Sequence, residues 1–258
     1  ILVGILAPAL GKMWRRAAEV ACQSNISALV KANLSYASEN DDSFVIAAED
    51  HGDNMKRWFG TREDADSAFT SAEGTLVEHL PGLKLSTCPS FKGASETAGQ
   101  DAAFEAGCGA YGYNDLYIGG SFGSYKDRRA MVKDGQAKGY NQSARLEDVA
   151  DMGGTVMFAD AAYFKSGGLI AYSFTHAPQW VPKAYSPPNP SIHFRHDGKA
   201  AIGWADGHAS TEEMTYSVEY TDTGAGGTPT EDIEDMELGW FGKQHDSLPD
   251  ANYLFDLN

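Results

Sequence analysis

The sequence predicts a protein of the α+β class, with one long N-terminal helix followed by a strand-rich head. Apolar residues recur at steps of three and four from Ala18 to Tyr36, which is the period of one helix face. After residue 41, short apolar runs alternate with polar and glycine-rich stretches. The 28 glycines and 11% aromatic residues are typical of a loop-rich, strand-rich domain. We therefore divide the chain into a helix at 1–40 and a head at 41–258.

The first ten residues of the predicted helix are apolar. A bilayer span needs about 20 such residues, so this stretch cannot cross a membrane by itself. It fits the end of a membrane helix, the end of a signal peptide or an ordinary core helix. A signal peptide fits least, because the amphipathic pattern continues to Tyr36. Pro8 lacks a backbone donor, so we expect a kink or opening there. The candidate assembly or membrane residues are Ile1, Leu2, Val3, Ile5, Leu6, Pro8 and Leu10.

The composition limits the partners of the head. The chain has 258 residues, enough for one sizeable core, and a net charge of −16. An acidic surface repels nucleic acid and anionic lipid, so we expect neither as a partner. The same charge favours solubility and tolerates divalent cations.

Three cysteines, Cys22, Cys88 and Cys108, allow one disulfide and one free thiol. None forms a C-x-x-C pair, so the spacing supports neither a zinc site nor a thioredoxin-like motif. A disulfide fits an extracytoplasmic setting. Cys88 with Cys108 would close a loop, whereas Cys22 with Cys88 would tie the helix to the head. Both pairings stay open, as does a chain with three reduced thiols.

The stretch 192–210 has the sequence IHFRHDGKAAIGWADGHAS. Its apolar runs predict strands at 192–196 and 199–205, joined by a tight Asp-Gly turn at 197–198. A second Asp-Gly pair at 206–207 predicts another turn.

Nine residues separate His196 from Asp206 and Gly207. This spacing places the histidine at the start of the predicted hairpin and the aspartate at its end. We expect a hydrogen bond between His196 and Asp206 that brackets the hairpin. A change at either residue is then expected to lower folding yield rather than a catalytic rate.

A metal or hydrolytic site is the main alternative for this region. Zinc and dimetal hydrolases use histidine and carboxylate ligands, which His193, His196, His208, Asp160 and Asp206 provide. The spacing argues against it, because His193 and His196 point to opposite faces of a strand. The chain also has no GxSxG or HExxH motif. We therefore predict a protein that is not an enzyme and has no catalytic residues.

Two features of the second half of the chain suggest ligands. A proline-rich aromatic loop surrounds Trp180 and is expected to be exposed and irregular. An acidic run near residue 235 offers the oxygen ligands that Ca²⁺ prefers, although it has no EF-hand pattern, and a solvated acidic loop is the alternative. The candidate calcium ligands are Asp232, Glu234, Asp235 and Glu237.

Several short motifs together resemble the type IV pilin-like proteins and type II secretion pseudopilins. The closest resemblance is to the group with the prepilin-type H-X9-DG signature, which His196, Asp206 and Gly207 match without adjustment. The chain lacks that family's processed N-terminus and early glutamate. The other matching motifs are Pro8-Ala9-Leu10, Arg15-Arg16, Cys22 with Asn25, Tyr36-Ala37, Glu39-Asn40-Asp41, Cys88-Pro89-Ser90, Tyr111-Gly112-Tyr113-Asn114 and the strand ending at Asp160.

This resemblance implies a pilin-like fold, with the long N-terminal helix packed on an antiparallel β-sheet head with elaborated loops. It implies a structural subunit of an extracellular filament on the bacterial surface, assembled through the apolar helix. Its partners would be copies of itself and the inner-membrane assembly machinery. The family also carries cysteines at the positions of Cys22 and Cys88, and secretion pseudopilins use calcium in the region of the acidic run. The alternatives are a secretion pseudopilin or, less favoured, a membrane-anchored periplasmic binding module that uses the Trp180 loop.

Overall fold

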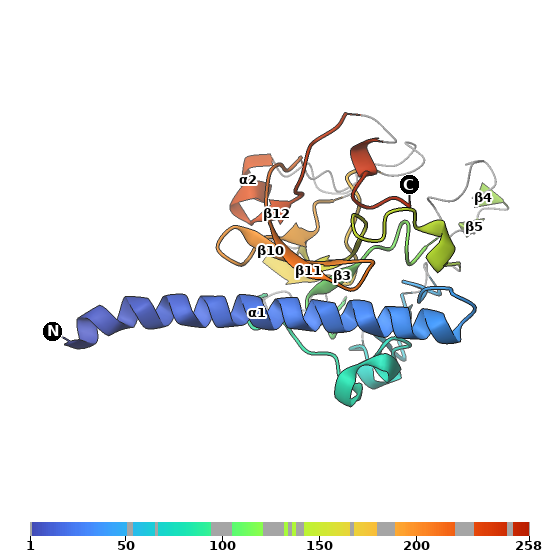
Figure 1. The fold of residues 1–258 in the computed structure, drawn as a ribbon, viewed down its shortest axis with the longest axis horizontal. Helices are drawn as coiled ribbons and strands as arrows, with labels where there is room; N and C mark the ends of the chain where they lie inside the picture. The colour runs from blue at the N-terminus through green and yellow to red at the C-terminus, as the bar shows by residue number, and fades with distance from the viewer. Residues whose placement is uncertain are drawn as a thin grey trace.

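The structure is a computed structural model with a mixed α+β architecture, as the sequence predicts. One long helix lies along one side of a head built from antiparallel sheets, and its N-terminal end extends beyond the head (Figure 1). The residues that the structure describes are 2–50, 54–64, 67–93, 105–120, 132–133, 136–137, 142–165, 168–179, 189–219, 230–246 and 250–257.

Helix α1 spans Leu2–Glu39. Its assignment continues without a break through Pro8, so the expected opening there is wrong. The helix ends where Asp41 and Asp42 adopt positive φ angles of 52° and 60°, a conformation that aspartate tolerates better than most residues. In the described part of the chain, no helix has both the length and the hydropathy to span a membrane.

The central sheet has four antiparallel strands in the order β11-β10-β6-β3. Strands β3 (Tyr111–Tyr113) and β6 (Val156–Asp160) are fully buried, since their apolar runs face packed layers on both sides. Strand β10 (Lys199–Trp204) turns into β11 (Ala209–Glu213) at the second Asp-Gly pair, where Gly207 has a φ of +100°. Glycine adopts this conformation without steric strain.

The C-terminal part of α1 packs directly on this sheet. Gly203 of β10 allows the close approach, because a Cβ there would lie 2.4 Å from a methyl carbon of Ile26 and 2.7 Å from one of Val30. A buried hydrogen bond also fixes the orientation of the helix on the sheet, since Asn33 of α1 donates to the hydroxyl of Tyr113 in β3 at 2.8 Å. The helix is therefore fixed on the sheet by both shape and hydrogen bonding.

Short paired strands and turns complete the described head. The strand pairs are β1 (Lys56–Arg57) with β2 (Gly60–Thr61), β4 (Val132–Lys133) with β5 (Gln136–Ala137), β7 (Ala162–Lys165) with β8 (Gly168–Ala171), and β9 (Ile192–His193) with β12 (Leu238–Gly239). Helix α2 spans Thr230–Asp235. Single 3-10 turns lie at Ser71–Glu73, Val77–His79, Pro81–Leu83, Leu146–Asp148 and Asp250–Asn252.

The predicted hairpin of the signature is only partly present. The tight turn at Asp197 and Gly198 is confirmed: both have positive φ, and His196 and Lys199 exchange backbone hydrogen bonds of 2.9 and 3.2 Å across it. Strand β9, however, ends at residue 193 and pairs with β12 instead of β10. The extended hairpin is the next one along the chain, in which β10 pairs with β11 from Lys199 opposite Glu213 to Gly203 opposite Ala209.

Candidate functional site

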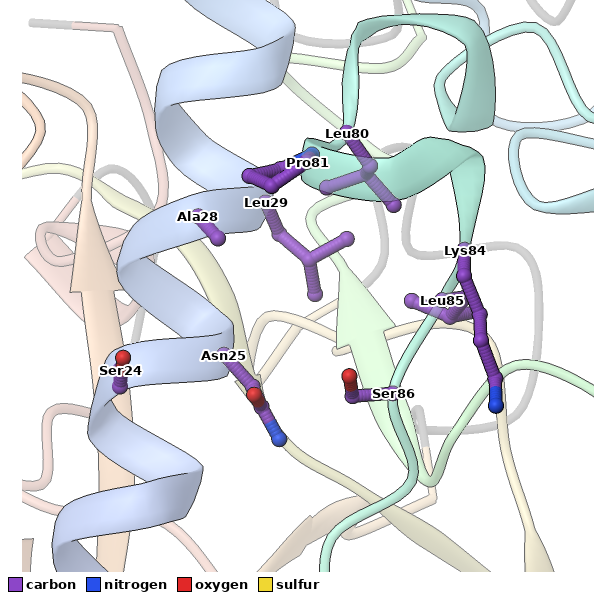
Figure 2. A pocket seen from close by; sticks show the side chains of 9 residues that line it. All are labelled: Ser24, Asn25, Ala28, Leu29, Leu80, Pro81, Lys84, Leu85 and Ser86. Carbon is purple, nitrogen blue, oxygen red and sulfur yellow. The ribbon is translucent and has the colours of Figure 1, made fainter.

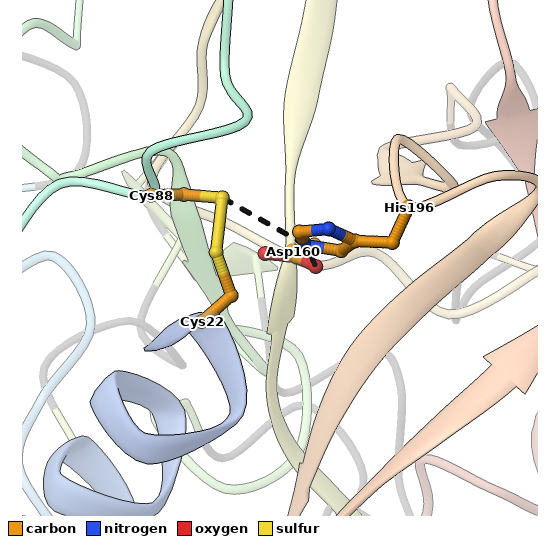
Figure 3. A group of neighbouring side chains, drawn as sticks. All are labelled: Cys22, Cys88, Asp160 and His196. Atoms are coloured by element: carbon orange, nitrogen blue, oxygen red, sulfur yellow. Dashed lines mark hydrogen bonds and ion pairs between the residues drawn. A yellow bond between two sulfur atoms is a disulfide. The ribbon is translucent and has the colours of Figure 1, made fainter. Parts of the chain in front are cut away.

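The signature histidine pairs with the aspartate that ends β6. Nε2 of His196 lies 3.0 Å from Oδ2 of Asp160 (Figure 3). The same oxygen accepts the backbone N–H of Ala201 at 2.8 Å. The antiparallel register of β6 on β10 causes this meeting, since Ala159 opposes Ile202 and the end of β6 therefore lies beside the start of β10.

The expected bond between His196 and Asp206 is wrong. Asp206 follows the far end of β10, and a six-residue strand spans about 20 Å, which separates the two side chains. Asp206 pairs instead with its neighbour, with Oδ1 2.5 Å from Nδ1 of His208, at a part-exposed turn. The H-X9-DG spacing thus marks the two ends of one strand rather than two bonded residues.

Arg195 supplies the positive charge of the buried cluster. Its Nη2 donates at 2.6 Å to Oδ1 of Asp160 and at 2.6 Å to the carbonyl of Ala110. Its Nε donates to Sγ of Cys88 at 3.3 Å. Burial by itself would raise the pKa of Asp160, but the charge of Arg195 and the hydrogen bond from His196 hold this pKa below its usual value. The carboxylate is therefore ionised and paired in the folded protein.

A disulfide closes the cluster. Cys22 of α1 is bonded to Cys88, with Cα atoms 5.4 Å apart, which settles the pairing that the sequence left open. Sγ of Cys88 lies 3.8 Å from Nε2 of His196. The third cysteine, Cys108, is a buried free thiol whose pKa burial raises to about 12, so it is protonated and unreactive at neutral pH.

The disulfide cluster (Cys22, Cys88, Asp160 and His196) joins three distant parts of the chain at one buried point. Figure 3 shows α1, the segment before β3 and the β6–β10 edge meeting there. The side chains of Asp160 and His196 are 0% and 1% exposed, so in this state they offer nothing to a soluble substrate. Nδ1 of His196 is buried and has no hydrogen-bond partner among the described residues. The arrangement is that of a buried structural cross-link between these segments.

The other histidines that a hydrolase would need are dispersed. His193 is buried against Arg195, with Nδ1 3.2 Å from Nη1, and burial together with that charge lowers its pKa to about 3. His208 lies at the turn with Asp206. Of the residues considered for a dimetal site, Asp160 and His196 therefore meet, His193 lies on the other side of Arg195, and Asp206 and His208 pair at a separate turn.

The acidic run does not form a convergent site either. Asp232, Glu234 and Asp235 are exposed on helix α2, and Glu237 follows it. Asp232 and Asp235 are three residues apart and share a helix face, but Glu234 is one or two residues from each and does not face them. Among the described residues, only the disulfide cluster brings three or more potential metal ligands within 4.8 Å of one another. The calcium site stays a prediction without geometric support, and Trp180 lies outside the described residues.

A second buried titratable pair escaped the sequence analysis. Oδ2 of Asp115 lies 3.7 Å from Nε2 of His176, and the Tyr172 hydroxyl lies 3.3 Å from the same nitrogen. Burial raises the pKa of Asp115 to about 8 and lowers that of His176 to about 4. Both groups are therefore uncharged at neutral pH, and the contact is not an ion pair despite its short distance. No motif or spacing in the sequence marks these residues.

A pocket of about 210 Å³ lies beside α1 (Figure 2). Asn25 and Ala28 line it from the helix, and Leu80, Pro81 and Lys84 line it from the segment opposite. Its one charged group is the lysine, so the pocket offers a mixed surface without a cluster of catalytic or ligating side chains.

The predicted assembly residues lie at the projecting end of α1. The backbone of 2–9 is helical, but the side chains of these residues and all of Ile1 lie outside the described part of the chain. Leu10 is described and is 50% exposed. Met13, Trp14 and Val20 are also exposed large apolar residues on this helix.

The chain matches no protein-family model, no curated protein and no solved structure. The functional argument therefore depends on the residues and geometry described above.

Proposed function

We propose that the protein is a structural subunit of an extracellular type IV pilus-like filament, which assembles through α1. One observation carries the proposal: α1 extends beyond the head (Figure 1), and it exposes large apolar side chains to solvent. Leu10, Met13 and Trp14 are 50%, 66% and 74% exposed. Their spacing of three and four residues places them on one helix face.

An exposed apolar helix face needs a partner, since apolar surface is unfavourable in water. Fully burying one Leu or Met side chain stabilises a contact by about 1.5–3 kcal/mol. Packing Leu10, Met13 and Trp14 against the same face of other copies would therefore supply a strong assembly force. The acidic heads would then form the outer surface of the filament and keep it soluble.

The disulfide supports this proposal mechanically. Cys22 is the first fully buried apolar residue along the described part of α1, so it lies where the helix joins the head. Its bond to Cys88 gives a covalent connection between the projecting helix and the head. Pulling force on a filament core would pass to the head through this bond as well as through the packed interface.

The test combines electron microscopy of filaments sheared from the source cells with mass spectrometry of their subunits. Wild-type chain should be the main subunit of abundant filaments. Trp14→Glu should fold normally, shown by an unchanged melting temperature, but be absent from filaments. Leu83→Glu is the matched control, because Leu83 is a 66% exposed apolar residue of the head. This variant should assemble into filaments normally.

Other outcomes point elsewhere. If filaments lack this chain while it stays in the envelope fraction, the proposal fails and a secretion pseudopilin or an anchored binding module takes its place. Assembly of Trp14→Glu at the wild-type level would show that the exposed helix face does not drive polymerisation.

A further inference from the structure

We propose that the disulfide cluster becomes a zinc-type metal site when the disulfide is reduced. Its four ligands would be the thiolates of Cys22 and Cys88, Nε2 of His196 and a carboxylate oxygen of Asp160. These four ligand atoms already lie within 4.8 Å of one another in a buried position (Figure 3). The inference does not depend on the proposed filament function.

The donor set matches the chemistry of zinc. Zn²⁺ binds four ligands tetrahedrally and accepts cysteine sulfur, histidine nitrogen and carboxylate oxygen. Metal–ligand bonds of about 2.0–2.3 Å give a tetrahedron with edges of about 3.3–3.8 Å. His196 Nε2 is 3.8 Å from Cys88 Sγ and 3.0 Å from Asp160 Oδ2. The main change needed is therefore separation of the two sulfurs, which reduction permits.

The charges also balance at this buried point. Two thiolates and the Asp160 carboxylate carry three negative charges, and Zn²⁺ with the Arg195 guanidinium carries three positive charges. Arg195 is already in place, donating to both Cys88 and Asp160. A positive charge beside a cysteine favours the thiolate that a metal requires. A cluster of metal, ligands and Arg195 with no net charge avoids the large free-energy cost of burying a net charge in the interior.

The imidazole can exchange its hydrogen bond to Asp160 for a bond to the metal. In the disulfide form Nε2 of His196 faces Asp160, while Nδ1 is buried with no partner among the described residues. Metal binding needs the lone pair of Nε2, so the ring proton moves to Nδ1. That shift breaks no other hydrogen bond of the ring.

The disulfide and the metal exclude each other. A dithiol reductant donates two electrons and two protons to the Cys22–Cys88 bond, giving two thiols and the oxidised form of the reductant. Binding of M²⁺ then releases the two thiol protons to solvent. Reoxidation by a disulfide oxidant removes the two electrons again, re-forms the S–S bond and expels the ion.

The test is a Co²⁺ titration of the full chain under anaerobic conditions, with and without a phosphine reductant. The reduced chain should bind one Co²⁺ with the visible absorption of a tetrahedral ion and a thiolate charge-transfer band, and Zn²⁺ should displace it. The oxidised chain should show neither band. Cys108→Ser is the control, because it removes the one thiol outside the site and should leave binding unchanged. Cys22→Ser should weaken binding by more than about 10-fold.

Binding by an unfolded chain is separated by a second measurement. Zn²⁺ should raise the melting temperature of the reduced chain, or restore its near-ultraviolet circular dichroism if reduction unfolds it, because the ion binds the folded site. The same rise is expected for reduced Cys108→Ser. Absence of tetrahedral bands in the reduced chain, equal bands in Cys22→Ser, or binding without recovery of native signal would each overturn the proposal.

Discussion

Replacing Asp160 with asparagine should destabilise the protein severely. The carboxylate pairs with Arg195 at 2.6 Å, with His196 at 3.0 Å and with the Ala201 amide at 2.8 Å, and it is 0% exposed. Asp160→Asn keeps the shape but leaves the guanidinium, which is 3% exposed, without its counter-charge. Removing one partner of a buried ion pair costs about 3–5 kcal/mol. Total stabilities of about 5–15 kcal/mol are usual, so this is a large fraction.

Equilibrium urea unfolding, followed by tryptophan fluorescence with the disulfide intact, measures this loss. Asp206→Asn is the matched control, because Asp206 forms its pair at a part-exposed turn and should lose less than about 1 kcal/mol. A double-mutant cycle with His196→Ala sharpens the comparison. We expect coupling above about 1 kcal/mol with Asp160 and within about 0.5 kcal/mol of zero with Asp206. Equal losses for the two asparagine variants, or coupling of His196 to Asp206 alone, would refute the pairing described here.

Three further predictions concern the disulfide, the helix–sheet contact and the buried acid. Reducing the bond between Cys22 and Cys88, which are 66 residues apart, should lower the unfolding free energy by about 4 kcal/mol when a chelator is present. Gly203→Ala should destabilise by about 1–3 kcal/mol, because its methyl group would overlap the face of α1. Raising the pH from 6.5 to 8 should lower the stability of the wild type by about 1.7 kcal/mol relative to Asp115→Asn.

The sign of the pH effect follows from the two buried groups. Folded Asp115 keeps its proton up to a pKa of about 8, whereas the unfolded chain releases it near 4, so stability falls as pH rises across this range. Folded His176 stays neutral down to a pKa of about 4, whereas the unfolded chain binds a proton near 6.5, so its contribution rises with pH over that interval. Folded His193, whose pKa is lowered to about 3, adds a rise of the same sign as His176, so comparing the wild type with Asp115→Asn isolates the fall caused by Asp115. The Arg57 charge lowers the pKa of Asp115 and the Glu105 charge raises it, each by less than burial does, and the Tyr172 hydroxyl contacts His176.

Each of these predictions has its own check. Chemical unfolding with and without a phosphine reductant tests the disulfide, and a loss below about 1 kcal/mol would show that packing alone fixes the helix. Gly11→Ala is the control for Gly203→Ala, because a Cβ at Gly11 of α1 would meet only Arg15 Nη1, at an ordinary contact distance of 3.7 Å. This variant should gain about 0.5–1 kcal/mol. Thermal melts of wild type and Asp115→Asn across the pH range test the raised pKa of Asp115. Parallel stability profiles of the two proteins would contradict it.

Local patterns in the sequence were enough for the elements that form from neighbouring residues. The three- and four-residue periodicity after Ala18 predicted the helix, and the apolar run at 155–160 predicted strand β6. The two Asp-Gly pairs predicted turns that are both present, since their positive φ angles depend on the residues themselves. The same local reasoning failed for the opening expected at Pro8, where the helix continues without a break.

The cluster depended on packing between segments far apart in the chain. The sequence alone determined that this is an α+β protein with a long apolar-headed helix, because periodicity and turn chemistry act over a few residues. Only the tertiary structure decided that His196 meets Asp160 rather than Asp206, and that Cys88 bonds Cys22 rather than Cys108. The physical reason for the first is strand register: pairing β6 antiparallel to β10 sets which ends meet, and no spacing within one strand encodes the partner across it. The reason for the second is the packing of α1 beside the segment that carries Cys88.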